Sequence, residues 1–131
     1  MEIDINWGTV DLTAMNGLSY VDLLLRLGAA TLLGAAIGLE RERLERAAGF
    51  RTHALVCLAS ALIMVVSIYG FPENDVLDPS RIAAQVVSGI GFLGAGVIIF
   101  RRNTVRGLTT AASLWAVSGV GLAVGAGLYI P

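Results

Sequence analysis

The chain has 131 residues, 56% of them hydrophobic and 15% charged, with a mean hydropathy of +0.76 and a formal net charge of −1 at pH 7. Soluble domains usually carry about 25% charged residues, so this composition argues against an ordinary soluble protein, and the slight negative charge does not favour nucleic acid as a partner. The length allows one domain at most, and a single cysteine, Cys57, excludes an internal disulfide.

Four stretches without charged residues follow one another along the chain, at 27–39, 54–71, 82–100 and 107–130. The first extends back to Leu18 if Asp22 and Arg26, four residues apart, form an ion pair. Each stretch reaches or approaches the roughly 20 apolar residues that a transmembrane helix needs. We therefore expect an all-α membrane protein, a compact bundle of four transmembrane helices at about 18–43, 52–71, 80–101 and 107–130.

The distribution of arginine predicts the orientation of these helices. The middle loop contains only Arg81, whereas the first and third loops contain seven arginines: Arg41, Arg43, Arg46, Arg51, Arg101, Arg102 and Arg106. Because basic residues in short loops stay on the cytoplasmic side, we expect both termini to lie outside. Residues 1–17 then form an outer-face segment ahead of the transmembrane domain at 18–131.

The stretch SGIGFLGAGVIIF, residues 88–100, contains the GxGxxG spacing of a dinucleotide-binding loop at Gly89, Gly91 and Gly94. Such a loop needs a strand before it and an acidic residue about 20 positions after it. The preceding residues continue a helical pattern, and the sequence contains no Asp or Glu after Pro79. The motif is therefore not a nucleotide site.

Small residues instead form stripes along three of the four predicted helices. Glycine weakens a helix in water by about 1 kcal/mol relative to alanine, but in a bilayer it lets helix backbones approach closely. The stripes are Ala30, Gly34 and Gly38; Ala84, Ser88, Gly91 and Ala95, flanked by Gly89 and Gly96; and Gly119, Ala123 and Gly127, with Gly121 and Gly125 on a neighbouring face. Packing within the bundle and pairing with a second subunit or another membrane protein both explain them. The third helix carries small residues around most of its circumference, so we expect it at the centre of the bundle.

Polar residues near the start of the third helix suggest two kinds of role. Asp78 suits the N-cap of a helix whose first residue is Pro79; alternatively, it attracts a cation together with the acidic residues of the middle loop. Gln85 lies one turn further in, where an unsatisfied amide costs several kcal/mol. We expect Gln85 to bond to Ser88 or to another helix, or to line a polar pathway.

The charged run ERER at 40–43 marks where the first helix leaves the membrane, since a charge at mid-bilayer costs about 2.5–3.5 kcal/mol. Glu42 and Arg46, four residues apart, fit a solvated helical extension that Gly49 ends. Glu40 directly follows the small-residue stripe of the first helix, and we expect it to reach inward.

The chain contains one histidine, His53, with Cys57 four residues later. Two ligands without a third make a weak metal site. One histidine also leaves no combination of nucleophile, base and orienting group. We therefore expect neither enzymatic activity nor a cofactor.

Four stretches resemble the N-terminal transmembrane domain of the MgtC/SapB family: GAAIGLERE (34–42), AGFRTHALV (48–56), DPSRIAAQVVSGIGFLGAGVII (78–99) and VRGLTTAASLWAVSGVG (105–121). The resemblance covers about residues 18–127. It implies a multi-pass protein of the bacterial inner membrane, linked to growth at low magnesium and, in pathogens, to survival inside macrophages. Family members typically continue into a fifth helix and often a cytoplasmic domain.

The resemblance also implies which residues carry function. The polar candidates are Glu40, Arg41, Arg51, Thr52, Asp78, Arg81, Gln85, Arg106, Thr109 and Thr110. The candidates for helix packing or partner contact are Gly34, Gly38, Ser88, Gly89, Gly91, Gly94, Ala95, Gly96, Trp115 and Gly119.

Two functions fit these observations. The preferred one is a non-enzymatic module that associates with itself or with another membrane protein, as family members are thought to do. The alternative is a channel or carrier for Mg²⁺ or another cation, with Asp78, Gln85 and Glu40 along its route. Mg²⁺ prefers oxygen ligands, and the scarcity of acidic residues at membrane depth favours the first function.

Overall fold

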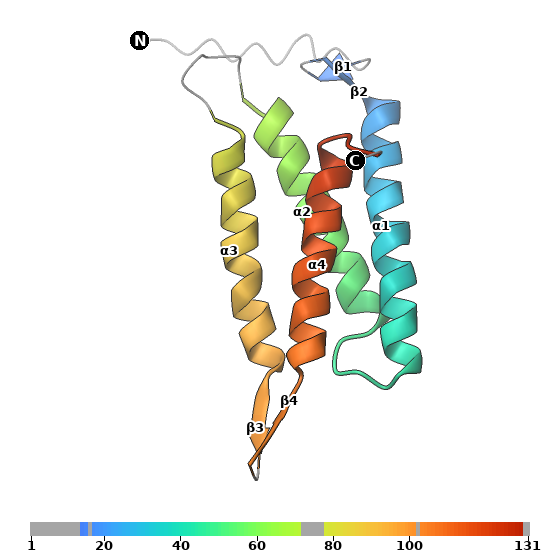
Figure 1. The fold of residues 1–131 in the computed structure, drawn as a ribbon. Helices are drawn as coiled ribbons and strands as arrows, with labels where there is room; N and C mark the ends of the chain where they lie inside the picture. Colours follow the sequence, from blue (N-terminus) through green and yellow to red (C-terminus); the bar gives the residue numbers. More distant parts are fainter. Residues whose placement is uncertain (1–13, 16, 72–77, 102, 130–131) are drawn as a thin grey trace.

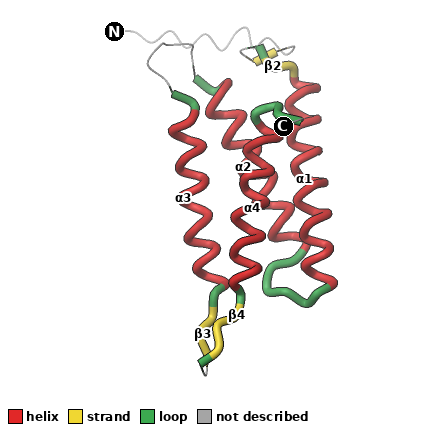
Figure 2. The backbone as a smooth tube through the Cα atoms, viewed as in Figure 1, coloured by secondary structure: helices red, strands yellow, loops and turns green. Residues whose placement is uncertain are grey.

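The computed structural model describes residues 14–15, 17–71, 78–101 and 103–129, so most of the predicted outer-face segment 1–17 and much of the middle loop lie outside the described residues (Figure 1). Its helices are α1 (Tyr20–Arg43), α2 (Phe50–Tyr69), α3 (Ser80–Val97) and α4 (Leu108–Gly125). Its short strands form two antiparallel pairs: β1 (Ala14–Met15) with β2 (Leu18–Ser19), and β3 (Ile99–Arg101) with β4 (Thr104–Arg106) (Figure 2). All four helices are long and apolar enough to span a membrane, which confirms the predicted four-helix membrane fold.

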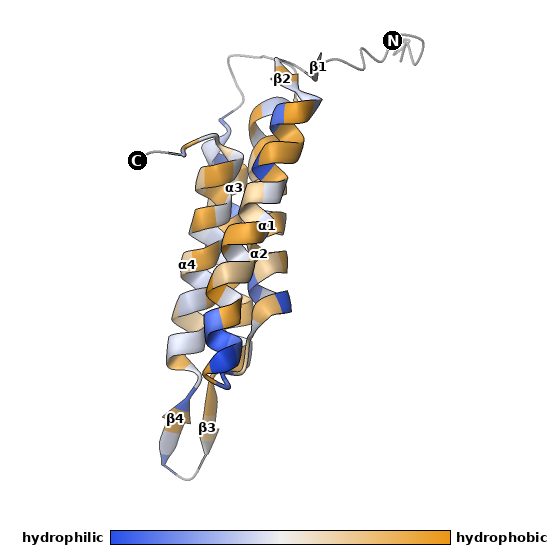
Figure 3. Cartoon of the chain, turned by 90° about the vertical axis from the view of Figure 1, so that its right-hand side faces the viewer, coloured by the Kyte–Doolittle hydropathy of each residue, from blue (hydrophilic) through white to orange (hydrophobic). Residues whose placement is uncertain are grey.

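The helices alternate in direction, so that α1 and α3 run one way and α2 and α4 the other (Figure 1). The start of α1 and the end of α4 therefore lie at the same end of the bundle, which we call the α1-start end. Hydrophobic residues dominate the middle of the helices, and strongly hydrophilic residues gather where α1 ends (Figure 3). This banding is the one expected of a protein whose middle lies in hydrocarbon.

The interior is built from small side chains, and the large apolar ones point outward. The buried cluster joins Ala30 of α1, Cys57 and Ala61 of α2, and Val117 and Val124 of α4. Outside, many large apolar side chains are more than half exposed, among them Leu24, Leu32, Phe92 and Trp115. In lipid, burial of large apolar groups gains little, so close packing of small residues holds helices together instead.

Gly34 and Gly38 bring α1 against α2, as their stripe predicted. A Cβ at Gly34 would lie 2.6 Å from both Cys57 Cβ and the carbonyl oxygen of His53. A Cβ at Gly38 would lie 2.7 Å from the Cα of Phe50. Real Cβ atoms do not approach other atoms this closely, so the two helices meet at a distance that only glycine permits.

On α4, the face that packs against α2 is that of Gly121 and Gly125, not that of Gly119. A Cβ at Gly121 would overlap the carbonyl oxygen of Cys57, and one at Gly125 would overlap that of Ala61. A Cβ at Gly119 would meet nothing within 4 Å. The sequence shows small residues on both faces of α4, and their spacing alone does not indicate which face packs against α2.

The prediction that α3 lies at the centre of the bundle is wrong. Its buried residues in the described chain are Ile90 and Gly94, and Gly94 faces Ala111 of α4, with a would-be Cβ 3.6 Å from Ala111 Cβ. The small residues of its predicted stripe, Ala84, Ser88, Gly91 and Ala95, and the flanking Gly89 and Gly96 are all exposed. Small residues permit close approach but do not say whether the neighbour belongs to the same chain, and here α1, α2 and α4 fill the centre.

The third helix also ends earlier than predicted, because residues 99–101 form the strand β3. The hairpin that follows requires left-handed backbone at Asn103 (φ 63°) and at Gly107 (φ 90°). A Cβ at Gly107 would overlap the carbonyl oxygen of Val97, so the return from α3 into α4 depends on this glycine. The apolar sequence of residues 97–100 continued the helical pattern and concealed the change.

The fourth helix ends at Gly125 rather than near 130. Leu128 N donates to Ala123 O (2.9 Å) and Gly127 N donates to Val124 O (3.0 Å). With Gly127 in the left-handed region (φ 80°), these two bonds form a Schellman motif, which satisfies carbonyls of the last turn.

Arg26 joins three helices at the α1-start end. The predicted ion pair with Asp22 is confirmed, with Arg26 Nη2 2.7 Å from Asp22 Oδ2. Arg26 Nη1 also donates to the carbonyl oxygen of Gly125 (2.8 Å), and the guanidinium carbon lies 5.4 Å from the centre of the Tyr69 ring. A cation at the C-terminal end of α4 is favoured by the helix dipole. The side chain is therefore buried with its charge partnered on every helix of the core.

We predict that Gly34→Ala lowers the free energy of unfolding by about 1–3 kcal/mol, the usual cost of overpacking. Its new methyl group has no room beside α2. The matched control is Gly28→Ala on the same helix, where a Cβ meets nothing within 4 Å. That change should leave stability unchanged or raise it by up to about 1 kcal/mol through helix propensity. Denaturation in detergent micelles, followed by circular dichroism, checks both, and equal stability of the two variants would contradict the close approach.

Candidate functional site

Asp78 caps α3, as the sequence predicted. Its Oδ1 accepts a hydrogen bond from Ser80 N (2.9 Å), and its carbonyl oxygen accepts one from Arg81 N (3.2 Å). The hydrogen bonds that Ser80 gives, with help from the charge of Arg81, lower the pKa of Asp78 below its usual value. The carboxylate is thus fixed in its charged form at the positive end of the helix dipole.

The start of α3 is also tied to the end of α2. Ser67 Oγ donates to the carbonyl oxygen of Pro79 (2.5 Å). Arg81 is exposed at this end, and Gln85 is exposed one turn further along the same face. Within the described residues Gln85 has no hydrogen-bond partner, so the predicted bond to Ser88 or to another helix is not formed. Instead Gln85 lines a hollow between α2 and α3.

The opposite end of the bundle gathers Glu40, Arg41, Arg51 and Thr52. Glu40 does not reach inward as predicted: its side chain is 61% exposed, and its Oε1 lies 3.0 Å from Arg41 Nη2. The Arg41 side chain is only 22% exposed, and its buried Nε has no hydrogen-bond partner among the described residues. Arg51 and Thr52 are exposed at the start of α2.

Glu42 holds α1 and α2 together at this end. Its Oε2 accepts a hydrogen bond from Phe50 N (2.9 Å), which is one of the free donors at the start of α2. The predicted helical extension ended by Gly49 is wrong, because α1 ends at Arg43 and Gly49 precedes the first residue of α2. A glutamate eight residues before the N–H group that donates to it gives no recognisable capping pattern in the sequence.

His53 forms a buried link between α2 and α4 that the sequence did not indicate. The fully buried ring places Nδ1 2.9 Å from Gly49 O and Nε2 3.0 Å from Ser113 Oγ. Ser113 Oγ also lies in position to donate to Thr110 O (2.8 Å). Thr110 itself is buried. His53 and Thr110 thus serve packing and hydrogen bonding between helices near the end that carries Arg51.

The other candidates lie apart from these groups. Arg106 is exposed on β4, Thr109 is exposed in the first turn of α4, and Trp115 is 58% exposed on the outside of α4. Asp78 precedes the start of α3 and Glu40 lies in the last turn of α1. Because α1 and α3 run in the same direction (Figure 1), these two tentative cation ligands lie at opposite ends of the bundle. Over the described ranges, no group of three or more His, Cys, Asp or Glu side chains is arranged to hold a metal ion.

We predict that Glu42→Ala frays the start of α2, because Phe50 N loses its acceptor. Loss of a helix cap typically costs about 0.5–2 kcal/mol, and amide hydrogen exchange at Phe50 should accelerate correspondingly. Glu42→Gln is the matched control, since its amide oxygen still accepts a hydrogen bond. Exchange that is equally slow in both variants and the unchanged chain would contradict the proposed capping contact.

Comparison with known proteins finds a family model and several relatives that agree with one another. A model of the MgtC family matches residues 27–131. The "Putative magnesium transporter YhiD" of Escherichia coli is 47% identical over 113 residues, covering 82% of this chain and 53% of that protein. Protein SapB of Bacillus subtilis is 47% identical over 114 residues (82% and 49% covered), and protein MgtC of Salmonella typhimurium is 51% identical over 106 residues (81% and 44% covered).

The chain spans about half the length of these relatives. No solved structure matches it. The family match extends over most of the chain and agrees with the four apolar helices and with the motifs that they carry. The chain therefore belongs to the MgtC family and is a multi-pass membrane protein.

Proposed function

We propose that this chain is a non-enzymatic module of the bacterial inner membrane that associates with another membrane protein or with a second copy of itself. In this way it supports adaptation to low magnesium and, in pathogens, survival inside macrophages. The association uses the outward face of α3 formed by Ala84, Ser88, Gly91 and Ala95, which we call the α3 stripe.

The observation that supports this proposal is the exposure of the α3 stripe. Consecutive members are three or four residues apart and share one face of the helix, and all four are exposed. A Cβ at Gly91 would meet nothing within 4 Å. In the core of this same chain, the space beside comparable glycines on α1 and α4 is occupied by the backbone of α2. A second transmembrane helix can approach the α3 stripe in the same way.

The arginine distribution supports an orientation for the module. The loops around Arg46 and Arg106 lie in the cytoplasm, and the α1-start end faces outside. Tyr20, Tyr69 and Tyr129 then lie together near the outer interface, where amphipathic rings are favoured.

The second candidate function is cation transport, with Mg²⁺ as the first ion to consider. It is supported by the printed name of YhiD and by Asp78, an exposed carboxylate whose pKa is lowered. It requires a route of oxygen ligands between Asp78 and Glu40, along which Gln85 is the natural intermediate. The separation of these acidic groups makes association the preferred function.

We predict that Gly91→Leu abolishes complementation of a deletion strain at low magnesium, because the added side chain keeps a partner helix away from the α3 stripe. The control, Gly28→Leu on α1, also adds a side chain into open space but lies on another helix, and it should complement fully. Growth rates at limiting and ample magnesium check both. Comparable membrane levels of the two variants are required for the comparison.

Cysteines placed singly on α3, in a Cys57→Ala background, test the contact directly. Crosslinks to a partner are expected at Ser88 and Gly91 and not at Ile90 or Gly94, which face inward. Saturable Mg²⁺ uptake by the purified chain in liposomes, lost on Asp78→Ala and unaffected by Gly91→Leu, would instead establish the transport function.

A further inference from the structure

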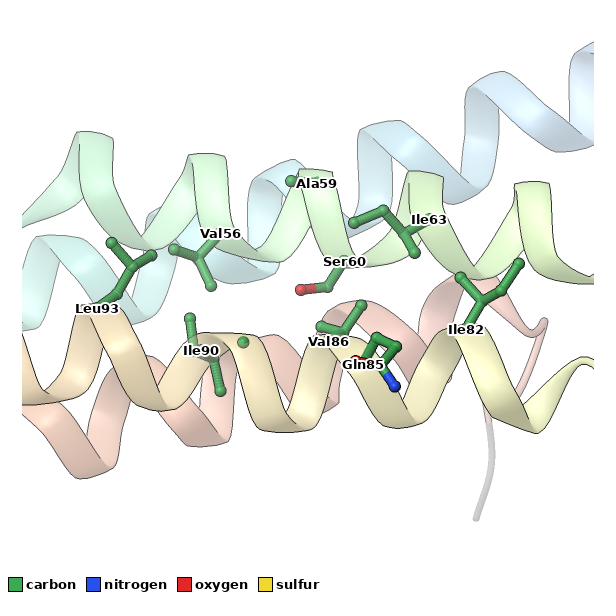
Figure 4. A pocket seen from close by; sticks show the side chains of 10 residues that line it. Val56, Ala59, Ser60, Ile63, Ile82, Gln85, Val86, Ile90 and Leu93 are labelled. Atoms are coloured by element: carbon green, nitrogen blue, oxygen red, sulfur yellow. The ribbon is translucent and has the colours of Figure 1, made fainter.

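Between α2 and α3 runs a lateral groove of about 450 Å³ that neither the core packing nor the α3 stripe accounts for (Figure 4). Its walls are apolar, with Val56 and Ile63 on α2 and Ile82, Val86 and Leu93 on α3. Gly89 lies in the α3 wall, and a Cβ there would meet nothing within 4 Å. The groove is therefore open space beside a helix, bounded by hydrocarbon side chains.

Two hydrogen-bonding groups interrupt this apolar lining. Ser60 is only 3% exposed, and its hydroxyl points into the space between α2 and α3 (Figure 4). Gln85 lies on the facing wall. Among the described residues neither side chain has a hydrogen-bond partner. Leaving such groups unpaired within hydrocarbon is unfavourable, so the occupant of the groove should carry hydrogen-bond acceptors at the depth of Gln85.

The depth of Gln85 matches the ester region of a bilayer. Gln85 is five residues beyond Ser80, or about 7.5 Å along the helix axis. The polar region on each side of a bilayer is about 5–7 Å thick, if the total is about 40–45 Å around a core of about 30 Å. Carbonyl oxygens of lipid esters lie at this boundary, at the depth of the Gln85 amide. Ser60 lies deeper, nine residues or about 13.5 Å before the end of α2 at Tyr69.

Arg81 lies just beyond the residues that line the groove and offers a charge for a phosphate. Arg81 is four residues before Gln85, so it lies one turn nearer the surface on the same face of α3. Arginine pairs with phosphate oxygens through directed N–H groups. The charge of Arg81 contributes to the lowered pKa of Asp78, so a carboxylate lies near the arginine, which favours a headgroup with both a phosphate and an ammonium group over a purely anionic one.

The length of the groove suits an extended lipid chain. It runs from Ile82 to Leu93, about 16.5 Å along the axis of α3, so an acyl chain can lie along it. Cavities of about 300–1,000 Å³ are those that enclose a single small ligand.

We propose that the groove between α2 and α3 binds one zwitterionic phospholipid, with its phosphate at Arg81, its ester oxygens at Gln85, and an acyl chain along the apolar walls past Ser60. The bound lipid fills the space that the loose packing of α3 leaves beside α2. This site is distinct from the α3 stripe, which lies on the opposite face of the helix.

The test uses the purified chain in vesicles of phosphatidylethanolamine and phosphatidylglycerol with a trace of phosphatidylethanolamine that carries a photoreactive diazirine in one acyl chain. After irradiation, mass spectrometry should find label enriched at Ile63, Gln85 and Leu93 relative to the exposed Leu24 and Leu32 of α1. Label spread evenly over exposed residues of all helices would overturn the proposal. Stronger enrichment with an equally labelled phosphatidylglycerol would overturn the choice of headgroup.

Gly89→Leu places its Cβ in open space and extends its side chain into the groove, and it should remove the enrichment. Gln85→Leu, a change at an exposed position, removes a hydrogen-bond donor and should reduce the enrichment even if Gly89→Leu fails to fold. Gly28→Leu is the control that should retain it. Unchanged labelling in a folded Gly89→Leu variant or in Gln85→Leu would overturn the assignment.

The outcome is separable from that of the proposed function. Loss of partner crosslinks in Gly91→Leu with intact lipid labelling would support two independent surfaces. If Ile63→Cys forms a disulfide with a second copy or another protein, a protein segment occupies the groove and the lipid proposal fails, whatever the result at the α3 stripe.

Discussion

The structure depends on backbone contact between α2 and its two neighbours, α1 and α4. Gly34 and Gly38 on one side, and Gly121 and Gly125 on the other, leave no room for a Cβ. In a bilayer, large apolar side chains gain little by turning inward, so the helices associate where their backbones come closest. The buried cluster of Ala30, Cys57 and Ala61 and the outward position of large apolar side chains follow from this constraint.

Polar contacts complete the core only at its ends. At the α1-start end, Arg26 connects α1 with the last turn of α4 and with the Tyr69 ring. At the other end, Glu42 caps α2, and His53 bonds toward Ser113. None of these polar contacts belongs to α3, which is attached by Ser67 and Pro79 at its start, by the packing of Gly94 against Ala111 of α4, and by the β3–β4 hairpin at its end. This difference in attachment leaves both an outward stripe and a lateral groove on one helix.

The number and position of the helices could be predicted from sequence. In a chain this apolar, about 20 residues without charge indicate a helix that spans the membrane. The cap at Asp78 and the pair of Asp22 with Arg26 were predictable for a related reason, since both are local contacts. Family motifs identified the chain further, because they record residue identities at fixed spacing rather than physical tendencies alone.

The remaining features depend on which surfaces meet, and spacing does not contain that information. Gly119 and Gly121 lie on nearly opposite faces of one helix, about 200° apart, and only the fold selects the second. The small residues of α3 suggested a central position, although the centre was already filled by three other helices. The contacts of Glu42 with Phe50 and of His53 with Ser113 join elements separated by turns or by 60 residues. The candidate polar residues therefore form two groups at opposite ends of the bundle and do not form one site.

The glycine contacts of the core reverse the usual vulnerability of a protein interior. In a soluble core, harm comes mainly from truncation, which leaves a void that the surroundings fill incompletely. Gly34, Gly38, Gly121 and Gly125 have no side chains to truncate, so the damaging changes at these positions are additions, down to a single methyl group. Sensitivity to mutation in this bundle should thus increase with the volume gained at a position rather than with the volume lost.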